Sequence, residues 1–435
     1  MKLSARAGAR PVAVAVLLGL TAACGATAAA PKADGPITIS FLSYNYGTPD
    51  LGGQGTQQLI DAFQRTHPNI RVKPQGVATK DVLVKLRTDT AAGSPPDVAQ
   101  IGWSKMGEAM SSLPLVPVQD IPPAPDWSRH VAGISPAIMK AVAKGGKVWA
   151  MPYTMSVPML YVNADLFRRA GLDPAKPPAT VEDVKEAALK IRKAGAQGAY
   201  FDIANSGKSD FLTQSIIASN GGGLVGADGS VTLDQPPAVQ ALSAMRDLTA
   251  SGAQPAVATE DAVAAFSAGK LGMLVTSTAL LASLEKTATG TFELRTGAFP
   301  GFAGKPARPT YSGAGLAVLA KDAAHRQAAW EFIRFLSSEE GYTIITSKIG
   351  YLPLRESIVD DDRYLGPYFA KNQLLKPSLA KLGTVAPYTS FAGKRANEAV
   401  VMLQDQAVEP IVFRGADPAT TLAAVAGKIR ALPQQ

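Results

Sequence analysis

The stretch Ile37-Thr-Ile-Ser-Phe-Leu42 opens the segment that decides the fold. Its β-branched residues alternate with other side chains, which predicts a strand. Helical periodicity follows over 54–65, a second alternating run over 70–73, a second helix over 81–90 and a buried strand over 97–101. The order β-α-β-α-β is typical of a parallel sheet covered by helices.

The same order recurs in the second half of the chain. Thr180-Val-Glu-Asp183 predicts a capped helix start, 271–275 predicts a further strand, and a helical pattern resumes after 311–319. The length of 435 residues exceeds what one core usually supports. We therefore expect an α/β fold of two lobes joined by more than one crossover. Its expected parts are an N-terminal lobe mainly at 36–145, a C-terminal lobe mainly at 146–310, and helical segments at 311–435 that cross back and complete both.

The N-terminus has the pattern of an export signal. Three basic residues and an apolar run from Val12 to Leu20 precede Ala22-Ala23-Cys24. The run is far shorter than the roughly 20 apolar residues that cross a bilayer. We expect a lipoprotein signal peptide at 1–23, a tether at 24–35 and lipidation of Cys24, which would hold the protein on the outer face of the cell membrane. The alternative is ordinary secretion with cleavage after Ala30, which would discard Cys24.

The charge of the chain does not indicate a nucleic-acid partner. The net charge of +8 falls to +5 without residues 1–23, because 40 basic side chains then remain against 35 acidic ones. No run of Lys and Arg interleaved with aromatic residues is present. We expect contact with the membrane through the lipid anchor.

No arrangement in the sequence calls for catalysis. His67, His130 and His325 are far apart and lack metal-ligand spacing, so we expect surface or capping roles for them. Gly221-Gly222-Gly223 lacks the Lys-Ser/Thr of a phosphate loop and predicts a turn. We expect no enzyme activity, no cofactor and no metal.

Aromatic and small polar residues follow the predicted strands. Ligands collect at the carboxyl ends of strands in open parallel sheets, where aromatic faces can stack on sugars and hydroxyl groups can fix their orientation. Asp50 is open to two interpretations, a hydroxyl or ammonium acceptor or a turn residue after Pro49. The residues that we expect to converge on a polar-ligand cleft are Tyr44, Asp50, Trp103, Tyr153, Ser156 and Ser277.

Three blocks of sequence carry a resemblance to a known family. They are Met151-Pro-Tyr-Thr-Met-Ser-Val-Pro-Met-Leu-Tyr-Val-Asn-Ala-Asp-Leu-Phe-Arg-Arg-Ala-Gly-Leu-Asp-Pro174, Ala265-Phe-Ser-Ala-Gly-Lys-Leu-Gly-Met273, and Ala329-Trp-Glu-Phe-Ile-Arg-Phe-Leu336 with Ile349-Gly-Tyr-Leu-Pro-Leu354. Together they resemble the extracellular solute-binding proteins of carbohydrate ABC importers, and most of all the glycerol-3-phosphate-binding and amino-sugar-binding branches. The resemblance implies a monomer with a two-lobed, type II-like periplasmic-binding-protein fold. It also implies hinge closure around a ligand in the cleft between the lobes, and delivery to an ABC permease.

The resemblance also implies positions for the pocket. These fall on Ser156, Ser277, Gly313 and Tyr351, with a phosphate-holding base at Arg395 or its neighbour Lys394. We favour Arg395, because arginine is the better bidentate anion ligand. Thr79 and Trp103 stand where the glycerol-3-phosphate branch carries Tyr and Glu, which moves the expectation towards a carbohydrate, including an amino sugar or oligosaccharide. The alternative is glycerol 3-phosphate or a glycerophosphodiester such as glycerophosphocholine.

Overall fold

The computed structural model describes residues 35–48, 51–381 and 384–433. The predicted signal peptide, the tether up to residue 34, the lipidation site Cys24 and the candidate ligand residue Asp50 lie outside them. The chain divides into Met1–Gly35 and Pro36–Gln435, and the second unit contains all the helices and strands described below.

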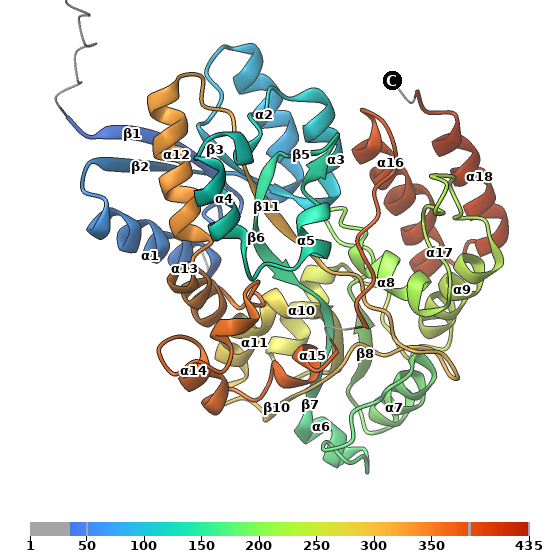
Figure 1. The fold of residues 1–435 in the computed structure, drawn as a ribbon. Coiled ribbons are helices and arrows are strands. Elements are labelled where there is room, and N and C mark those ends of the chain that lie inside the picture. The colour runs from blue at the N-terminus through green and yellow to red at the C-terminus, as the bar shows by residue number, and fades with distance from the viewer. Residues whose placement is uncertain (1–34, 49–50, 382–383, 434–435) are drawn as a thin grey trace, which may run out of the picture. The chain divides into compact units, whose positions relative to one another are not determined.

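A five-stranded sheet forms around the first predicted strand (Figure 1). In spatial order it consists of β2 (Ile70–Gly76), β1 (Ile37–Ser43), β3 (Val98–Gly102), β11 (Ser312–Val318) and β6 (Ala150–Ser156). β1 runs parallel to β2 and β3, but β11 is antiparallel to both of its neighbours. The sheet is therefore mixed, not wholly parallel as expected, because β11 runs opposite to both β3 and β6.

A second sheet has four strands. Their order is β10 (Leu294–Gly297), β7 (Pro158–Asn163), β9 (Leu271–Ser277) and β8 (Gln197–Phe201), and only the β8–β9 pair is parallel. A small hairpin joins β4 (Ala143–Lys144) to β5 (Lys147–Val148). β6 pairs in the first sheet although it lies within the 146–310 segment assigned above to the second lobe. The chain passes from the first sheet to the second at Val157, between β6 and β7.

Helices cover both sheets. Those up to the second sheet are α1 (Leu51–Thr66), α2 (Val82–Ala91), α3 (Trp103–Ser112), α4 (Ala124–Val131), α5 (Pro136–Lys140) and α6 (Ala164–Arg169). Next come α7 (Val181–Lys193), α8 (Phe211–Ser219), α9 (Pro236–Ala250), α10 (Thr259–Ser267) and α11 (Leu281–Ala288). The last are α12 (Ala323–Leu336), α13 (Glu339–Ile344), α14 (Gly366–Lys371), α15 (Lys376–Leu379), α16 (Ala396–Leu403), α17 (Glu409–Arg414) and α18 (Pro418–Arg430).

Two hydrophobic clusters hold these elements together. The first surrounds the five-stranded sheet, includes α1, α2, α3 and α12, and reaches one face of the second sheet. The second cluster packs the other face of the second sheet against α7, α8, α9 and the C-terminal helices α16–α18. No helix among the described residues is both long enough and apolar enough to span a bilayer.

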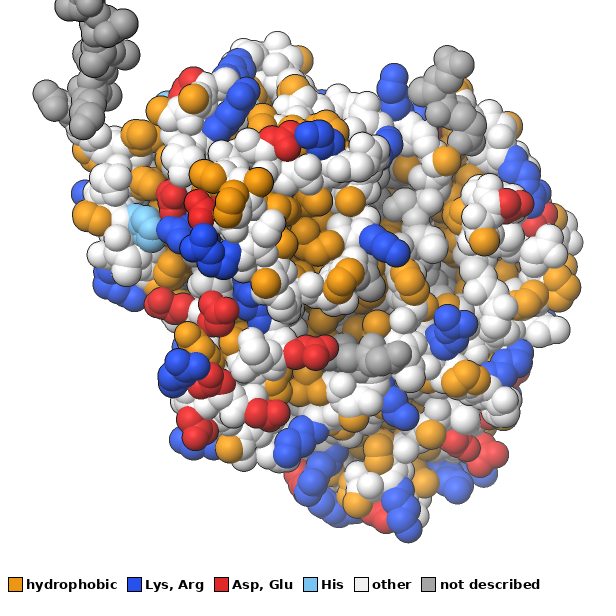
Figure 2. Space-filling view, viewed as in Figure 1, with side chains coloured by type: hydrophobic (Ala, Val, Ile, Leu, Met, Phe, Trp, Pro, Cys, Tyr) orange, Lys and Arg blue, Asp and Glu red, His pale blue; other side chains and the backbone are white. Residues whose placement is uncertain are grey.

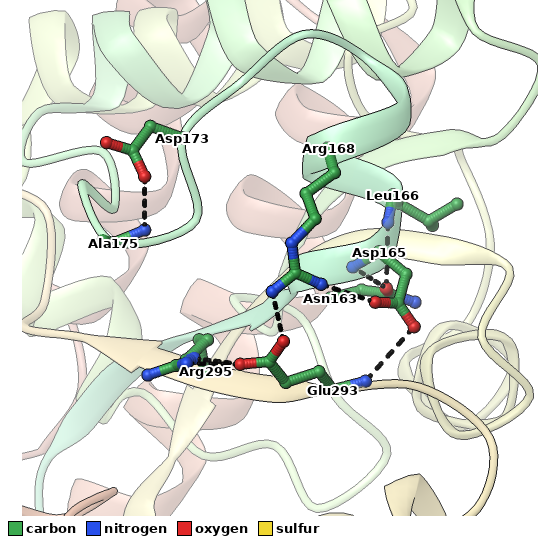
Figure 3. Close-up of polar contacts among 8 residues, drawn as sticks. All are labelled: Asn163, Asp165, Leu166, Arg168, Asp173, Ala175, Glu293 and Arg295. Carbon is green, nitrogen blue, oxygen red and sulfur yellow. Dashed lines mark hydrogen bonds and ion pairs between the residues drawn. The ribbon is translucent and has the colours of Figure 1, made fainter.

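Part of the motif at 151–174 has a structural role (Figure 3). Asn163 ends β7 and caps α6, since its Oδ1 accepts hydrogen bonds from the backbone N–H groups of Asp165 and Leu166, both at 3.1 Å. Arg168 pairs with Asp165 and with Glu293, which precedes β10. These contacts fix the β7–α6 turn against β10.

Candidate functional site

The exits of the first-sheet strands lie at one edge. β11 pairs Ala314 with Gly102, Gly313 with Met155 and Ser312 with Ser156. The amino end of β11 therefore lies at the edge where β3 and β6 end. Trp103, which follows β3 and begins α3, lies against this point, because a Cβ built at Gly313 would be 2.8 Å from its Nε1 atom.

Gly313 is required at this edge. Its φ of +143° lies in the region that side chains rarely adopt, and a Cβ there would stand 1.9 Å from the carbonyl oxygen of Thr154. The pairing of β11 with β6 shifts register between Ala314 and Gly315. The irregularity lets the backbone of β11 approach both β6 and the indole of Trp103.

Buried polar atoms without hydrogen-bond partners gather around this edge. They are Asn45 Nδ2, Gln100 Nε2, Trp103 Nε1, Tyr153 OH and Thr154 Oγ1. The oxygens of the two amides are engaged: Tyr351 OH donates to Asn45 Oδ1 at 3.1 Å, and Ser43 Oγ donates to Gln100 Oε1 at 2.7 Å. The nitrogens are left as donors. Leaving a buried donor unpaired costs about 1–3 kcal/mol, so a group that brings acceptors to this edge would gain hydrogen bonds that the protein alone does not make.

Three tyrosines surround the same donors. Burial raises the pKa of Tyr44 to about 12, against the lowering effect of the nearby side chains of Thr154, Gln100 and Tyr351. The side chains of Thr154 and Gln100 thus lie near the Tyr44 phenol. Burial also raises the pKa values of Tyr153 and Tyr351. All three phenols are therefore neutral at pH 7 and can both donate and accept.

A cavity of about 400 Å³ opens beside Trp103. One wall is α3, with Trp103, Gly107 and Met110, and the opposite wall is the segment 388–393. Gln214 of α8 holds that segment: its Nε2 donates to Thr389 O at 2.9 Å, and its Oε1 accepts from Thr389 N at 3.1 Å. The cavity thus lies between a helix of the first cluster and a segment fastened to the second.

A buried lysine and a buried aspartate lie on helices of the two clusters, and sequence analysis did not identify them. Lys105 of α3 is 5% exposed and Asp210, at the start of α8, is fully buried. Burial lowers the pKa of Lys105, and the charge of Asp210 opposes this. Burial likewise raises the pKa of Asp210, against hydrogen bonds from Tyr388 OH at 2.6 Å and Gln214 Nε2 at 3.0 Å. In the sequence, the only sign of this arrangement was the position of Lys105, two residues after Trp103 at the end of a predicted strand.

The two predicted serines lie near the passage between the sheets. Ser156 ends β6, is 4% exposed and pairs with Ser312. Ser277 ends β9 opposite Pro158, and its Oγ accepts from Ala279 N at 3.1 Å. Only Val157 separates Ser156 from Pro158, so the structure brings both serines to the crossover.

Arg395 lies apart from these residues. It precedes α16, and its guanidinium donates to the carboxylate of Glu398 at 2.6 Å and 2.5 Å. The described lining of the cavity reaches Gly393 but includes neither Lys394 nor Arg395. Thr79 is exposed at the start of a short helical turn. The anion-binding role of Arg395 stays a prediction, and it would require Glu398 to be displaced.

The described part of the chain holds no group of three or more His, Cys, Asp or Glu side chains that could bind a metal ion. His130, expected at the surface or in a cap, is instead partly buried: its Nε2 lies 2.8 Å from Ser337 Oγ. Burial, with Arg355 and Arg334 nearby, lowers its pKa to about 4.

The fold and this site define a class of protein, and the chain belongs to the bacterial extracellular solute-binding protein family, whose profile matches residues 47–343. A putative binding protein of Brucella abortus strain 2308 is 25% identical over 423 residues, which cover 95% of this chain and 97% of the relative. The sn-glycerol-3-phosphate-binding periplasmic protein UgpB of Pectobacterium atrosepticum is 26% identical over 336 residues, 74% of each chain.

Solved structures agree on the fold. The GacH receptor of Streptomyces glaucescens, studied unliganded and with acarbose, matches with a TM-score of 0.79 at 22% identity over 91% of this chain and 98% of that one. UgpB of Mycobacterium tuberculosis, in complex with glycerophosphocholine, gives 0.78 at 22% identity with the same coverage. The predicted α/β class, the two-lobed periplasmic-binding-protein fold and the family resemblance are confirmed. The protein is a bacterial extracellular solute-binding protein.

Proposed function

We propose that this protein captures a carbohydrate between its two lobes and delivers it to an ABC permease. The unpaired N–H donors of Asn45, Gln100 and Trp103 carry the proposal. A sugar presents several hydroxyl oxygens in a small volume, and each can accept from one donor while its own proton goes to a phenol. Tyr44, Tyr153 and Tyr351 supply neutral phenols and apolar ring faces at the same edge.

The ligand favours closure only through contacts that are better in the closed form. Ser156 and Ser277 flank the crossover between the sheets, and Gly313 brings the backbone of β11 close to the pocket. We propose that all three residues contact the ligand. We further propose that the mature protein is a monomer anchored through lipidated Cys24. Replacing Cys24 with alanine would then move the protein from the detergent-soluble membrane fraction to the medium or periplasm.

A second candidate ligand is glycerol 3-phosphate or a glycerophosphodiester. The relatives named UgpB favour it. Lys105 is a buried cation of α3, two residues after Trp103, so we propose it as the phosphate contact in place of Arg395. In that mode the phosphate would compete with Asp210 for the ammonium group.

A thermal-shift screen of the chain from residue 25 onwards tests both. The compounds are mono- and disaccharides, amino sugars, glycerol 3-phosphate and glycerophosphocholine. A ligand at about 100 times its dissociation constant adds roughly 2.7 kcal/mol to the free energy of unfolding, which shifts the melt by degrees. A shift with a phosphate-free sugar supports the first ligand class, and a shift only with phosphate compounds supports the second.

The anion contact is then assigned with matched lysine variants. Lys105→Met should weaken a phosphate ligand at least about tenfold and change a neutral sugar less. Lys394→Met, at an exposed lysine outside the cavity lining, should change neither. If Lys394→Met weakens the phosphate ligand and Lys105→Met does not, the anion lies at the start of α16.

A further inference from the structure

A large apolar groove adjoins the polar site. It has a volume of about 1100 Å³, and its described lining includes the charged residues Lys140 and Glu356. Apolar side chains form most of the walls, and these include Val131, Ile134, Ile138, Met139, Met155 and Leu354. Figure 2 shows hydrophobic side chains gathered in a hollow near the centre of the face on which Figure 1 places α5 and β6.

The walls of this groove are tied to one another around the first sheet. Ile134 forms a β-bridge with Arg355, and Met155 forms one with Leu352. The Arg355 guanidinium donates to Ala132 O at 2.7 Å and to Ser337 O at 3.1 Å. Val385 and Pro387, which complete the lining, adjoin the segment 388–393 that Gln214 fastens to the second cluster. The groove, like the cavity beside Trp103, therefore has one wall in the first cluster and another that adjoins the second.

The groove is continuous with the polar site. Lys140 and Ala143 line both the groove and the cavity beside Trp103. Met155 and Tyr311, at the floor of the groove, precede Ser156 and Ser312 directly in the chain. A molecule whose polar part lies at the strand exits can therefore extend an apolar part into the groove.

We propose that the physiological ligand is amphipathic, with a polyol head at the strand exits and an apolar chain or ring system in the groove of α4, α5 and residues 353–356. The proposal rests on the proposed function and names the substrate class of the same site. Five apolar side chains of the groove, Val131, Ile138, Met139, Val148 and Val385, are only half-buried without an occupant. Covering them with an apolar chain removes surface from water on both partners.

Chain-length dependence tests the proposal. Binding of methyl, hexyl and octyl β-D-glucopyranoside is measured by isothermal titration, below the critical micelle concentration of each. A second series compares glycerophosphocholine with lysophosphatidylcholine that carries a hexanoyl chain, which separates a sugar head from a phosphodiester head. A fully buried methylene strengthens binding roughly fourfold, so we expect the octyl glucoside to bind at least about thirtyfold more tightly than the methyl glucoside.

Two matched variants locate the chain. Ile138→Lys places a charge in the groove and should abolish the gain with chain length. Val84→Lys makes the same change at an apolar residue of α2 that is 62% exposed outside the groove, and the gain should persist. Thermal unfolding of both variants checks that they fold.

The outcomes separate this proposal from the proposed function. A polar head that binds with no gain from the chain overturns the apolar subsite and leaves the proposed function standing. A gain in affinity with chain length that survives Ile138→Lys also overturns the subsite, and so does a gain that Val84→Lys removes equally. Failure of every chain-bearing probe to bind overturns it as well. A gain that depends on Ile138 while neither head alone binds supports the subsite and counts against the carbohydrate assignment.

Discussion

Trp103→Phe should weaken ligand binding while leaving the unliganded protein nearly as stable as the wild type. The indole is 3% exposed, and its Nε1 has no hydrogen-bond partner. Phenylalanine keeps the aromatic face and removes the donor. A net hydrogen bond contributes about 0.5–1.5 kcal/mol, so the dissociation constant should rise roughly two- to twelvefold. In the free protein, relief of the unpaired donor offsets the smaller ring volume, since each effect is on the order of 1–2 kcal/mol.

Trp103→Ala is a poorer test, because the structure buries this side chain in the first hydrophobic cluster. Truncating a buried tryptophan to alanine costs about 3–5 kcal/mol, which would mix packing with recognition.

The control for the phenylalanine variant is Trp330→Phe. Trp330 lies on α12 in the same cluster and is 2% exposed. Isothermal titration with the ligand found in the screen gives the affinity, and thermal unfolding without ligand gives the stability. The reasoning is refuted if Trp103→Phe binds within twofold of the wild type, or if Trp330→Phe loses as much affinity.

Three further predictions concern the frame of the site. Gly313→Ala should lower the free energy of unfolding, measured in urea, by at least about 2 kcal/mol, because its Cβ would overlap a strand carbonyl. Gly427→Ala in α18 has open space around it and should raise the free energy of unfolding by about 0.5–1 kcal/mol. Equal effects of the two substitutions would contradict this reasoning. Arg395→Ala should leave the affinity for a neutral sugar within twofold, because the guanidinium pairs with exposed Glu398, and a larger loss measured by titration would place Arg395 in the pocket. The pKa of His130 is about 4 in the fold against about 6.5 unfolded, so the free energy of unfolding should fall by about 3 kcal/mol as pH falls from 6.5 through 4. His130→Gln should show a flatter pH dependence in unfolding measured from pH 7 to 4, and an unchanged slope would count against the assignment.

Local patterns predicted the elements well. The alternation at Ile37–Leu42 corresponds to β1, and Thr180 caps α7 as expected, with its Oγ1 accepting from Asp183 N at 3.1 Å. Sheet membership was harder to predict, because it depends on pairing between distant segments. Nothing near Ser312–Val318 shows that this strand enters the first sheet antiparallel, between β3 and β6.

Some residues of the candidate site could likewise be predicted from local sequence, and others could not. Strand-exit residues such as Tyr44 and Trp103 could be found from sequence, because the edge at which strands end follows from the order of elements. Asn45 and Gln100 could not, since their unpaired nitrogens become evident only when Tyr351 and Ser43 occupy the amide oxygens. Arg395 was chosen by resemblance, and its partner Glu398 lies one helical turn away, where spacing alone does not reveal a preference for pairing over ligand contact.

Helix α3 connects recognition to the position of the two lobes. Trp103, at its start, lies at the strand exits, and two residues later Lys105 is near enough to Asp210, at the start of α8, for the aspartate charge to raise its pKa against the effect of burial. One turn further, Glu108 Oε2 accepts from Asn397 N of α16 at 2.9 Å and the carboxylate pairs with Arg87. A rigid helix cannot move its first residue independently of the next two turns. Under the proposed function, a ligand that engages Trp103 would act on the same element that holds the second cluster, and its differential affinity would be expressed as a change in the relative position of the lobes.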